Sequence, residues 1–381
     1  MKQDLSVLFI DADGELPLSV ARCLAQHSDV KLHVFSRYSQ TLLRYSKHVD
    51  SYYSEKVEND QQRLNYIRDA VQITDADIIM AVREPSMRFM AEHRAELEKI
   101  AHVMPLPDLD TFNKVIDKWK LSQLLKTNNI PGPETILYTD DKEFVKSLDQ
   151  IAFPALLKPA RGGAGDQIRS FNKKEELLNY LDRNRKYANK FIVQSYINGF
   201  DIDCSVLARD GKILAYTIQK GIILRKFTYS SGIEFVRHPL TLETAERIVS
   251  ATNWTGVAHF DFRYDMEDKQ VKLVDFNARF WNTVAGSLVV GVNFPYLTIM
   301  TALGENFPVP DYESGKFIMS KAVFKQIAKN VISKPGVHFK FSETELKYVF
   351  SDPVPEIKKI AGSAKKLIRD TLEKKIFRIV K

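Results

Sequence analysis

Strand-like and helix-like segments alternate along the first hundred residues, and this alternation restricts the fold more than any other feature of the sequence. Residues 5–10 form a short apolar run, and apolar residues then recur at helical spacing over residues 18–25. Residues 31–35 and 76–82 predict further strands, the latter after a polar helical stretch. A chain of this kind folds into a doubly wound parallel sheet. We therefore predict an α/β domain over residues 1–108.

Charged side chains follow these strands, at the sheet edge where ligands of open α/β sheets bind. They make Asp11, Arg37, Arg83 and Glu84 candidate substrate residues. Helix caps and solvated loop charges explain the same residues, and we favour that interpretation for each. The loop after the first strand lacks the G-x-G-x-x-G pattern, so a dinucleotide site is not indicated.

Composition excludes several classes of protein. At 381 residues the chain is long enough for two or three packed units, with the 44% hydrophobic and 27% charged residues of a globular protein. Two cysteines, Cys23 and Cys204, cannot build a disulfide framework, and they predict a reducing, cytoplasmic location. The apolar run near the start is too short for a signal peptide, and none approaches a membrane span of about 18 residues. We expect neither a secreted, a fibrous nor an integral membrane protein.

Prolines and turn residues divide the rest of the chain. Pro105 and Pro107 forbid a continuing helix, and helical spacing resumes over residues 109–125. Beyond this point the pattern is mixed α and β. Residues 210–211 and 265–270 each join two strand-like runs, which predicts two hairpins.

A predicted strand that ends in Lys158 leads into a glycine-rich loop at residues 162–165 and an acidic residue, Asp166. Glycines let backbone N–H groups close around phosphate oxygens, and the lysine adds a neutralising charge. The spacing is not that of a Walker loop. Taken alone, the loop is explained as well by a mobile turn as by a phosphate site.

The predicted hairpin over residues 257–279 carries polar side chains at every second position. His259, Asp261 and Arg263 share one face of the first strand, and Asp275, Asn277 and Arg279 share one face of the second. Two carboxylates and an amide oxygen on adjacent strands are ligands that Mg²⁺ accepts alongside phosphates and water. A solvated sheet face with cross-strand charge pairs is the alternative, but it explains the apolar residues on the opposite face less well.

A third segment, residues 191–201, is an apolar strand that ends in a turn with an acid, Asp201. By itself it indicates only a strand and a turn. Together, however, the order of Lys118 at a helix start, Lys158 with its glycine loop, this turn and the acidic hairpin resembles the ATP-grasp superfamily over roughly residues 1–310.

Further segments support the resemblance: residues 117–118 and 130–135 look like the usual entry into the ATP-binding part, and residues 280–281 and 291–295 are similar to the carbamoyl-phosphate-synthase-like, carboxylate–amine ligase branch. The resemblance implies an α/β pre-ATP-grasp domain, an α+β ATP-grasp domain and a basic helical tail. The implied boundaries are 1–108, 109–310 with a mobile lid at about 120–188, and 311–381.

The resemblance also implies site residues. Lys158 and Arg279 would be the catalytic residues, Arg279 facing the acceptor carboxylate and its acyl phosphate. The implied nucleotide contacts are Lys118, Lys158, Gly162, Gly163, Ala164, Gly165, Gln194, Ser195, Tyr196, Asp201 and Lys220. The implied metal ligands are Asp261, Asp275 and Asn277. The first two metal positions are more often Glu in this superfamily, and the adenine hinge has Gln194 where an acidic residue is frequent.

The function that the resemblance implies is an ATP- and Mg²⁺-dependent ligase, with Mn²⁺ as an alternative ion, that joins a small-molecule carboxylate to an amine through an acyl phosphate. One alternative is a carbamoyl-phosphate-synthase-like kinase, although the sequence has no internal duplication. Another is a nucleotide-binding protein without turnover.

The C-terminal segment carries most of the net charge. Residues 356–381 hold nine Lys or Arg and three Asp or Glu, which is +6 of the chain's +7. Apolar residues recur there at intervals of three and four, which predicts an amphipathic helix. Contact with the inner face of an anionic membrane and docking on this chain or on a partner in a homodimer explain it equally well. We expect no nucleic-acid partner, because no basic platform with aromatic residues accompanies the charge.

Overall fold

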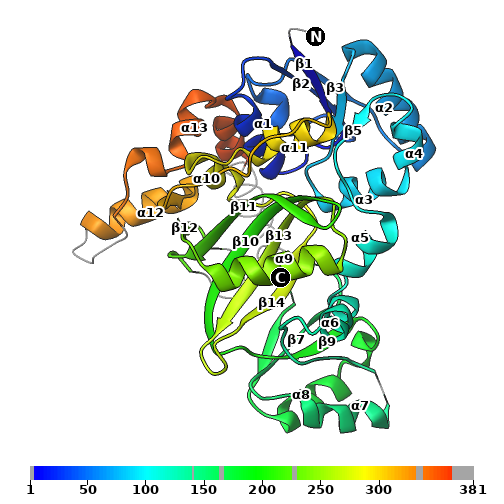
Figure 1. Cartoon of the computed structure of the whole chain (residues 1–381), viewed down its shortest axis with the longest axis vertical. Coiled ribbons are helices and arrows are strands. Elements are labelled where there is room, and N and C mark those ends of the chain that lie inside the picture. Colours follow the sequence, from blue (N-terminus) through cyan, green and yellow to red (C-terminus); the bar gives the residue numbers. More distant parts are fainter. Residues whose placement is uncertain (1–3, 140, 163–166, 225–229, 332–337, 363–381) are drawn as a thin grey trace, which may run out of the picture.

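The computed structural model describes residues 4–139, 141–162, 167–224, 230–331 and 338–362. Within these residues the strands form three sheets. Figure 1 shows a parallel sheet at one end of the molecule, a large antiparallel sheet in the middle and a small sheet at the other end. No helix in the described part of the chain has the length and apolar character needed to cross a membrane.

The N-terminal sheet is parallel and has the strand order β3-β2-β1-β4-β5. Its strands are β1 (Leu5–Phe9), β2 (Val30–Ser36), β3 (Ser51–Ser54), β4 (Ile78–Met80) and β5 (His102–Val103). The inner strands are buried on both faces, as a parallel sheet between helices requires. The helices are α1 (Leu16–Leu24), α2 (Asp60–Thr74), α3 (Glu84–Glu92) and α4 (Arg94–Leu97). This confirms the doubly wound domain, and its strand order reverses between β1 and β4, where such sheets bind ligands.

The middle sheet is antiparallel, with the order β14-β13-β10-β11-β12-β15. Its strands are β10 (Gly199–Arg209), β11 (Lys212–Gly221), β12 (Gly232–Phe235), β13 (Gly256–Asp265), β14 (Val271–Asn277) and β15 (Gly315–Ile318). Helix α9 (Pro239–Ala251) covers one face (Figure 1). Both predicted hairpins are present: β10 pairs with β11 and β13 with β14. Asp210 and Gly211 form the first turn with φ of 49° and 74°, the left-handed geometry that such turns require.

The small sheet has the order β6-β9-β7-β8 and a hydrophobic core of its own. Its strands are β6 (Thr135–Leu137), β7 (Ala155–Pro159), β8 (Arg169–Phe171) and β9 (Phe191–Ser195), with helices α7 (Lys142–Ser147) and α8 (Lys174–Asp182). The helical pattern over residues 109–125 forms two helices, α5 (Leu109–Val115) and α6 (Lys118–Thr127), and Lys118 begins the second, as predicted. The pattern breaks there because the Asp117 side chain accepts hydrogen bonds from the Trp119 and Lys120 N–H groups and starts a new helix.

The chain after β14 returns to the N-terminal domain. Helices α10 (Val284–Val289) and α11 (Phe294–Ala302) both contact α1, and α12 (Ser320–Val331), α13 (Leu346–Ser351) and helical residues 354–362 follow β15. Asp352 is buried against the N-terminal domain, where its carboxylate accepts from Ser46 Oγ at 2.7 Å and lies 3.7 Å from Arg22 Nε. Most of the predicted basic amphipathic helix, from residue 363 on, lies outside the described residues.

Candidate functional site

A row of polar side chains crosses four strands of the middle sheet. The strand register sets Gln219 of β11 beside Asp203 of β10, and Asp261 of β13 beside Asp275 of β14. Cys204 pairs with Phe260, so Asp203 and Asp261 are also neighbours. The predicted alternation along the second hairpin is therefore confirmed, and it extends over two strands more than the sequence indicated.

Two carboxylates of this row, Asp203 and Asp261, have a raised pKa. Burial, and then the charge of Asp275, raise the pKa of Asp261 to about 7, although 46% of its side chain is still reachable by solvent. Burial and the charges of Asp261 and Asp201 also hold the pKa of Asp203 well above its ordinary value. Acidic groups that repel one another in this way attract a cation.

His259 lies one row further along the same face. Its Nδ1 is 2.9 Å from Ser205 Oγ, its Nε2 is 3.3 Å from Asp261 Oδ1, and its ring stacks on Trp281. Burial lowers the pKa of His259 to about 3, so the imidazole is neutral near pH 7. Asp203, His259 and Asp261 together offer three ligand atoms that lie within 4.8 Å of one another.

Two lysines face the acidic row from the other side. Lys118, at the start of α6, lies with its Nζ 3.1 Å from Asp275 Oδ1 and donates to the Gly162 carbonyl at 2.7 Å. Lys158, at the end of β7, is buried, and its Nζ lies 3.4 Å from the Val274 carbonyl. Burial and the positive charge of Lys118 lower the pKa of Lys158 to about 8. Because the charges of the two ammonium groups repel each other, the pair favours binding of an anion.

The predicted adenine hinge lies at the end of β9. Gln194 is buried and donates from Nε2 to Thr135 Oγ1 at 2.9 Å, whereas Ser195 Oγ accepts from the Ala152 N–H. The Tyr196 side chain is 39% exposed. Asp201 begins the polar face of β10, where its carboxylate accepts from Arg263 at 2.7 Å.

One predicted nucleotide contact is not brought to this group. Alternation along β11 places Gln219 beside Asp203 and turns Lys220 to the opposite face of the sheet. There the Lys220 Nζ lies 4.1 Å from the centre of the Phe200 ring. Of the glycine-rich loop, Gly162 is described, with a φ of 107°, whereas Gly163, Ala164, Gly165 and Asp166 lie outside the described residues.

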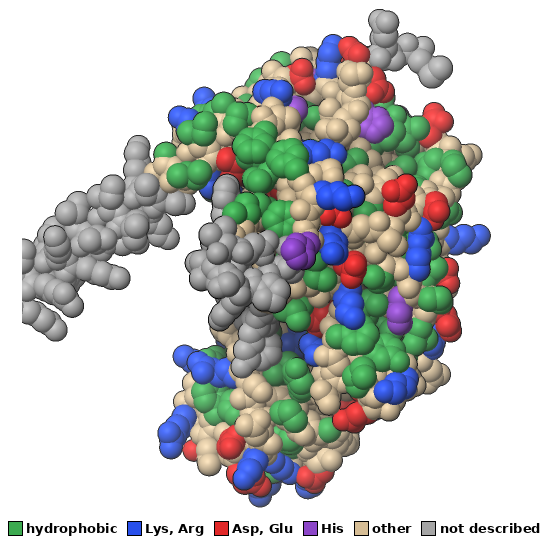
Figure 2. Space-filling model, turned by 90° about the vertical axis from the view of Figure 1, so that its left-hand side faces the viewer, with side chains coloured by type: hydrophobic (Ala, Val, Ile, Leu, Met, Phe, Trp, Pro, Cys, Tyr) green, Lys and Arg blue, Asp and Glu red, His purple; other side chains and the backbone are tan. Residues whose placement is uncertain are grey.

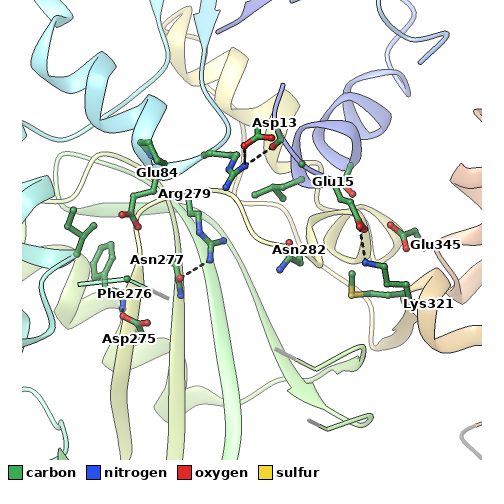
Figure 3. Close-up of a pocket in the computed structure, with 18 of the residues that line it drawn as sticks. Asp13, Glu15, Glu84, Asp275, Phe276, Asn277, Arg279, Asn282, Lys321 and Glu345 are labelled. Carbon is green, nitrogen blue, oxygen red and sulfur yellow. Dashed lines mark hydrogen bonds and ion pairs between the residues drawn. The ribbon is translucent and has the colours of Figure 1, made fainter. Parts of the chain in front are cut away.

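A pocket of about 440 Å³ opens beside the end of β14, between the N-terminal domain and the middle sheet. Its walls come from the loops after β1 and β4, from residues 275–279, from Lys118 and Gly162, and from Met319, Lys321 and Glu345 of the C-terminal segment. Arg279 projects into it and donates to Asn277 Oδ1 at 2.9 Å (Figure 3).

The four candidate residues of the N-terminal sheet have different positions. Arg83 and Glu84 line the pocket, so they are more than the solvated loop charges that we favoured. Asp11 is a structural residue, as expected, because its buried carboxylate accepts from the Val82 and Arg83 N–H groups. Arg37 is exposed and does not line the pocket.

Several site residues were missed by the sequence analysis. Asp203 could have been found, because Asp201, Asp203 and Ser205 alternate along one strand exactly as the residues of the hairpin do. Glu15, Lys321 and Glu345 gave no such signal: they meet only because the C-terminal segment folds back onto the loop after β1.

The residues contributed by the middle sheet and by the small sheet with α6 fit a magnesium nucleotide. Asp261, Asp275 and Asn277 present carboxylate and amide oxygens on neighbouring strands, the donor set that Mg²⁺ prefers. Burial and like charges raise the pKa of Asp261 and lower that of Lys158, so each charge is disfavoured in the protein alone, even though Lys118 and Asp275 form an ion pair. A divalent cation would stabilise the charge of Asp261, and a polyphosphate would stabilise that of Lys158.

Comparison with known proteins agrees with this geometry. Residues 115–283 match the family model of the ATP-grasp domain. The chain is 27% identical over 241 residues to the carbamoyl phosphate synthase large chain, C-terminal section, of Methanopyrus kandleri, which covers 57% of this chain and 44% of that protein. It is 24% identical over 208 residues to the D-alanine–D-alanine ligase of Anaplasma marginale (strain Florida), covering 50% of this chain and 62% of that one.

The fold has solved counterparts as well. The biotin carboxylase domain of the 2-oxoglutarate carboxylase of Hydrogenobacter thermophilus, solved as a dimer with MgADP and bicarbonate, superposes with a TM-score of 0.64 at 19% identity. The match covers 83% of this chain and 74% of that one. This chain thus spans about half of the two curated relatives above. The match to the ATP-grasp family model over residues 115–283 includes the acidic hairpin and both lysines.

Proposed function

We propose that this protein is an ATP-dependent, ADP-forming ligase that activates a carboxylate as an acyl phosphate and joins it to an amine. One observation carries the proposal: the charges of Lys118 and Lys158 act on the carboxylates of Asp261 and Asp275, and Lys118 and Asp275 of this group line the 440 Å³ pocket. The relatedness to a D-alanine–D-alanine ligase over half of the chain supports it.

In the proposed reaction, an oxygen of the substrate carboxylate attacks the γ-phosphorus of ATP, and the bond to the bridging oxygen breaks to release ADP. The amine then attacks the acyl carbon, phosphate leaves, and the amine loses a proton. Phosphoryl transfer depends on positioning and charge neutralisation more than on a protein nucleophile. Lys118 and Lys158 bind the phosphates, and Arg279 orients the carboxylate in the pocket.

The nucleotide contacts proposed beyond these lysines are the glycine loop at residues 162–165, the hinge of Gln194, Ser195 and Tyr196, and Asp201 for the ribose. Asp261, Asp275 and Asn277 would hold Mg²⁺, which supplies charge neutralisation on the phosphates when bound. Mn²⁺ is a second candidate ion. Because a neutral imidazole, that of His259, lies beside Asp261, Mn²⁺ should be included in a screen of metal ions.

The direct test mixes the protein with Mg-ATP and panels of acids and amines and measures ADP release. We expect ADP only when both a carboxylate and a nucleophile are present. Lys158→Ala and Asp275→Ala should each lower turnover by at least tenfold, because the first removes a positive charge at the phosphates and the second removes a ligand of Mg²⁺. Full turnover in either variant would contradict the roles assigned to these residues.

A carbamoyl-phosphate-synthase-like kinase is the second candidate, because a relative of that name matches 57% of the chain. That hypothesis predicts carbamoyl phosphate from bicarbonate, ammonia and ATP. The product can be detected by its conversion to citrulline with added ornithine carbamoyltransferase. The ligase hypothesis predicts no such product.

We propose that the domains extend over residues 1–108, 109–310 and 311–381, with the small-sheet lobe at about 120–188 acting as a lid. We also propose a cytoplasmic location, because both cysteines are free and buried. For the basic segment, contact with an anionic membrane and docking in a homodimer remain the two hypotheses. A chain ending at Gly362 keeps the contacts of Asp352 and Lys359, so comparing its liposome co-sedimentation and its mass in solution with the full chain tests both.

A further inference from the structure

The pocket beside β14 contains several charged side chains, and most of them already have partners. Among its acids, Asp13 pairs with Arg83 at 2.6 Å and Asp275 with Lys118 at 3.1 Å. The remaining paired acids are Glu15, held by Lys321 at 2.8 Å and Lys359 at 3.0 Å, and Glu345, which accepts from Ser320 N and Oγ at 2.8 Å.

Glu84 is different. It starts α3 in the loop after β4, it lines the pocket, and it is partly buried. No described residue donates a hydrogen bond to its carboxylate or forms an ion pair with it. Burial raises the pKa of Glu84, and among the surrounding charges that of Arg279 acts on it most strongly. A carboxylate in such a position lacks the partner that a buried charge needs.

Arg279 is the corresponding positive group. Its guanidinium donates to the Phe280 carbonyl at 2.7 Å and to Asn277 Oδ1 at 2.9 Å, and both acceptors are neutral. No carboxylate in the described part of the chain forms an ion pair with it. Figure 3 shows Glu84 and Arg279 at the same end of the pocket as Asp275 and Asn277, whereas Glu15, Lys321 and Glu345 lie at the other end.

From this arrangement we infer that the carboxylate substrate is an amino acid in its zwitterionic form. Its carboxylate lies on Arg279, next to the phosphate and metal positions, and its ammonium group lies on Glu84. This inference rests on the proposed ligase function and adds the class of substrate to it. A ligand with one positive and one negative group provides an ionic partner for both Glu84 and Arg279. A simple carboxylate would leave the partly buried Glu84 without one.

The paired acids and lysines at the other end favour the same substrate class. Glu15 is paired with two lysines of the C-terminal segment, and Glu345 accepts two hydrogen bonds from Ser320, so both acids at this end already have donors. The free positive and negative charges of the pocket are thus concentrated beside β14, where the chemistry takes place.

The test separates activation of the carboxylate from the identity of the amine. Hydroxylamine replaces the amine: it attacks the acyl carbon of the acyl phosphate, phosphate leaves, and a hydroxamate forms that is measured by its iron complex. The full-length protein receives Mg-ATP, hydroxylamine and one of the common L- or D-α-amino acids. A parallel reaction receives the same acid without its α-amino group, such as propionate for alanine or succinate for aspartate.

We expect hydroxamate from at least one amino acid, at a rate about tenfold to a hundredfold above that of its matched acid, because a charge-assisted hydrogen bond to Glu84 is lost in the latter. Glu84→Gln should remove this preference by slowing the amino acid alone, with the affinity for Mg-ATP unchanged. Glu92→Gln, an exposed position on the same helix, is the matched control and should behave as the wild type.

Three outcomes would overturn the inference while leaving an ATP site in place: equal rates for the two members of each pair, no hydroxamate from any amino acid despite Mg-ATP binding, or an unchanged preference in Glu84→Gln. A Glu84→Gln variant that slows both members equally would show that Glu84 only positions Arg279, and would also overturn it. If calorimetry finds no Mg-ATP binding at all, the ligase function fails together with this inference.

Discussion

The buried amine of Lys158 should make the nucleotide-free protein less stable, and its removal should therefore have opposite effects on stability and on ATP binding. Burial and the charge of Lys118 lower its pKa from 10.5 to about 8. Each tenfold change in proton affinity corresponds to about 1.4 kcal/mol. At pH 7 the charged Lys158 thus lowers the free energy of unfolding by about 3 kcal/mol.

Lys158→Met keeps a chain of similar length and removes the charge. Because Asp275 and Asp261 lose an attractive neighbour, we expect a net gain of about 1–3 kcal/mol rather than the full amount. In domains of this size class each kcal/mol raises the melting temperature by about 2–4 °C. The melting temperature of the nucleotide-free variant should therefore rise by several degrees at pH 7.

The sign of the pH dependence follows from the lowered pKa. The folded protein binds the Lys158 proton more weakly than the unfolded chain does, so the penalty is complete below pH 8 and disappears as the pH rises from 8 to 10.5. The difference between wild type and variant should shrink over the same interval. Saturating Mg-ATP reduces the variant's advantage: at about 100 times its dissociation constant it stabilises the wild type by about 2.7 kcal/mol. An affinity at least tenfold weaker would lose about 1.4 kcal/mol of this in the variant.

The assay is thermal unfolding with and without Mg-ATP between pH 7 and 10.5. Lys120→Met is the control, since Lys120 is exposed on α6 and its replacement should change neither quantity. A nucleotide-free Lys158→Met protein that melts at or below the wild-type temperature, or one that is still fully stabilised by Mg-ATP, would refute the reasoning.

Three further predictions concern other parts of the molecule. Protons compete with Mg²⁺ for Asp261, whose pKa is raised to about 7, so nucleotide-free Mg²⁺ affinity measured by calorimetry should fall by up to about tenfold per pH unit below pH 7; a constant affinity from pH 7 to 5 would argue against this. Asp352→Ala removes one of the two carboxylates beside the buried Arg22 and leaves Glu356 at 3.9 Å, so it should cost about 3 kcal/mol, visible as a lower melting temperature and as proteolysis within residues 346–362; unchanged protease resistance would argue against a role of Asp352 in holding this segment. Burial raises the pKa of Cys23 and Cys204, so neither thiol should react with a disulfide reagent at pH 8 until the protein unfolds, and rapid labelling of the native protein would disprove it.

Local patterns predicted the parts of the site that lie on single strands or hairpins. The alternation of Asp275 and Asn277 predicted one face of β14, whereas a register shift between Asp261 and Phe262, which alternation does not reveal, sets Asp261 opposite Asp275. Alternation could have corrected the assignment of Lys220, because Gln219 and Lys220 must face opposite sides of β11. The break between α5 and α6 depended on a single capping side chain, Asp117, which helical periodicity alone does not reveal.

The sequence by itself determined the parallel N-terminal sheet, the two antiparallel hairpins and the lysine and carboxylate groups that resemble those of an ATP-grasp domain. These features depend on a residue spacing of two or 3.6 along a single element. What only the tertiary structure decided is the pocket: that Glu84 and Arg279 share one end without charge partners, and that Lys321, Glu345 and Lys359 close the other end on Glu15. These residues are separated by up to several hundred positions in the chain. Their meeting depends on how three layers pack against one another, and no local spacing encodes that arrangement.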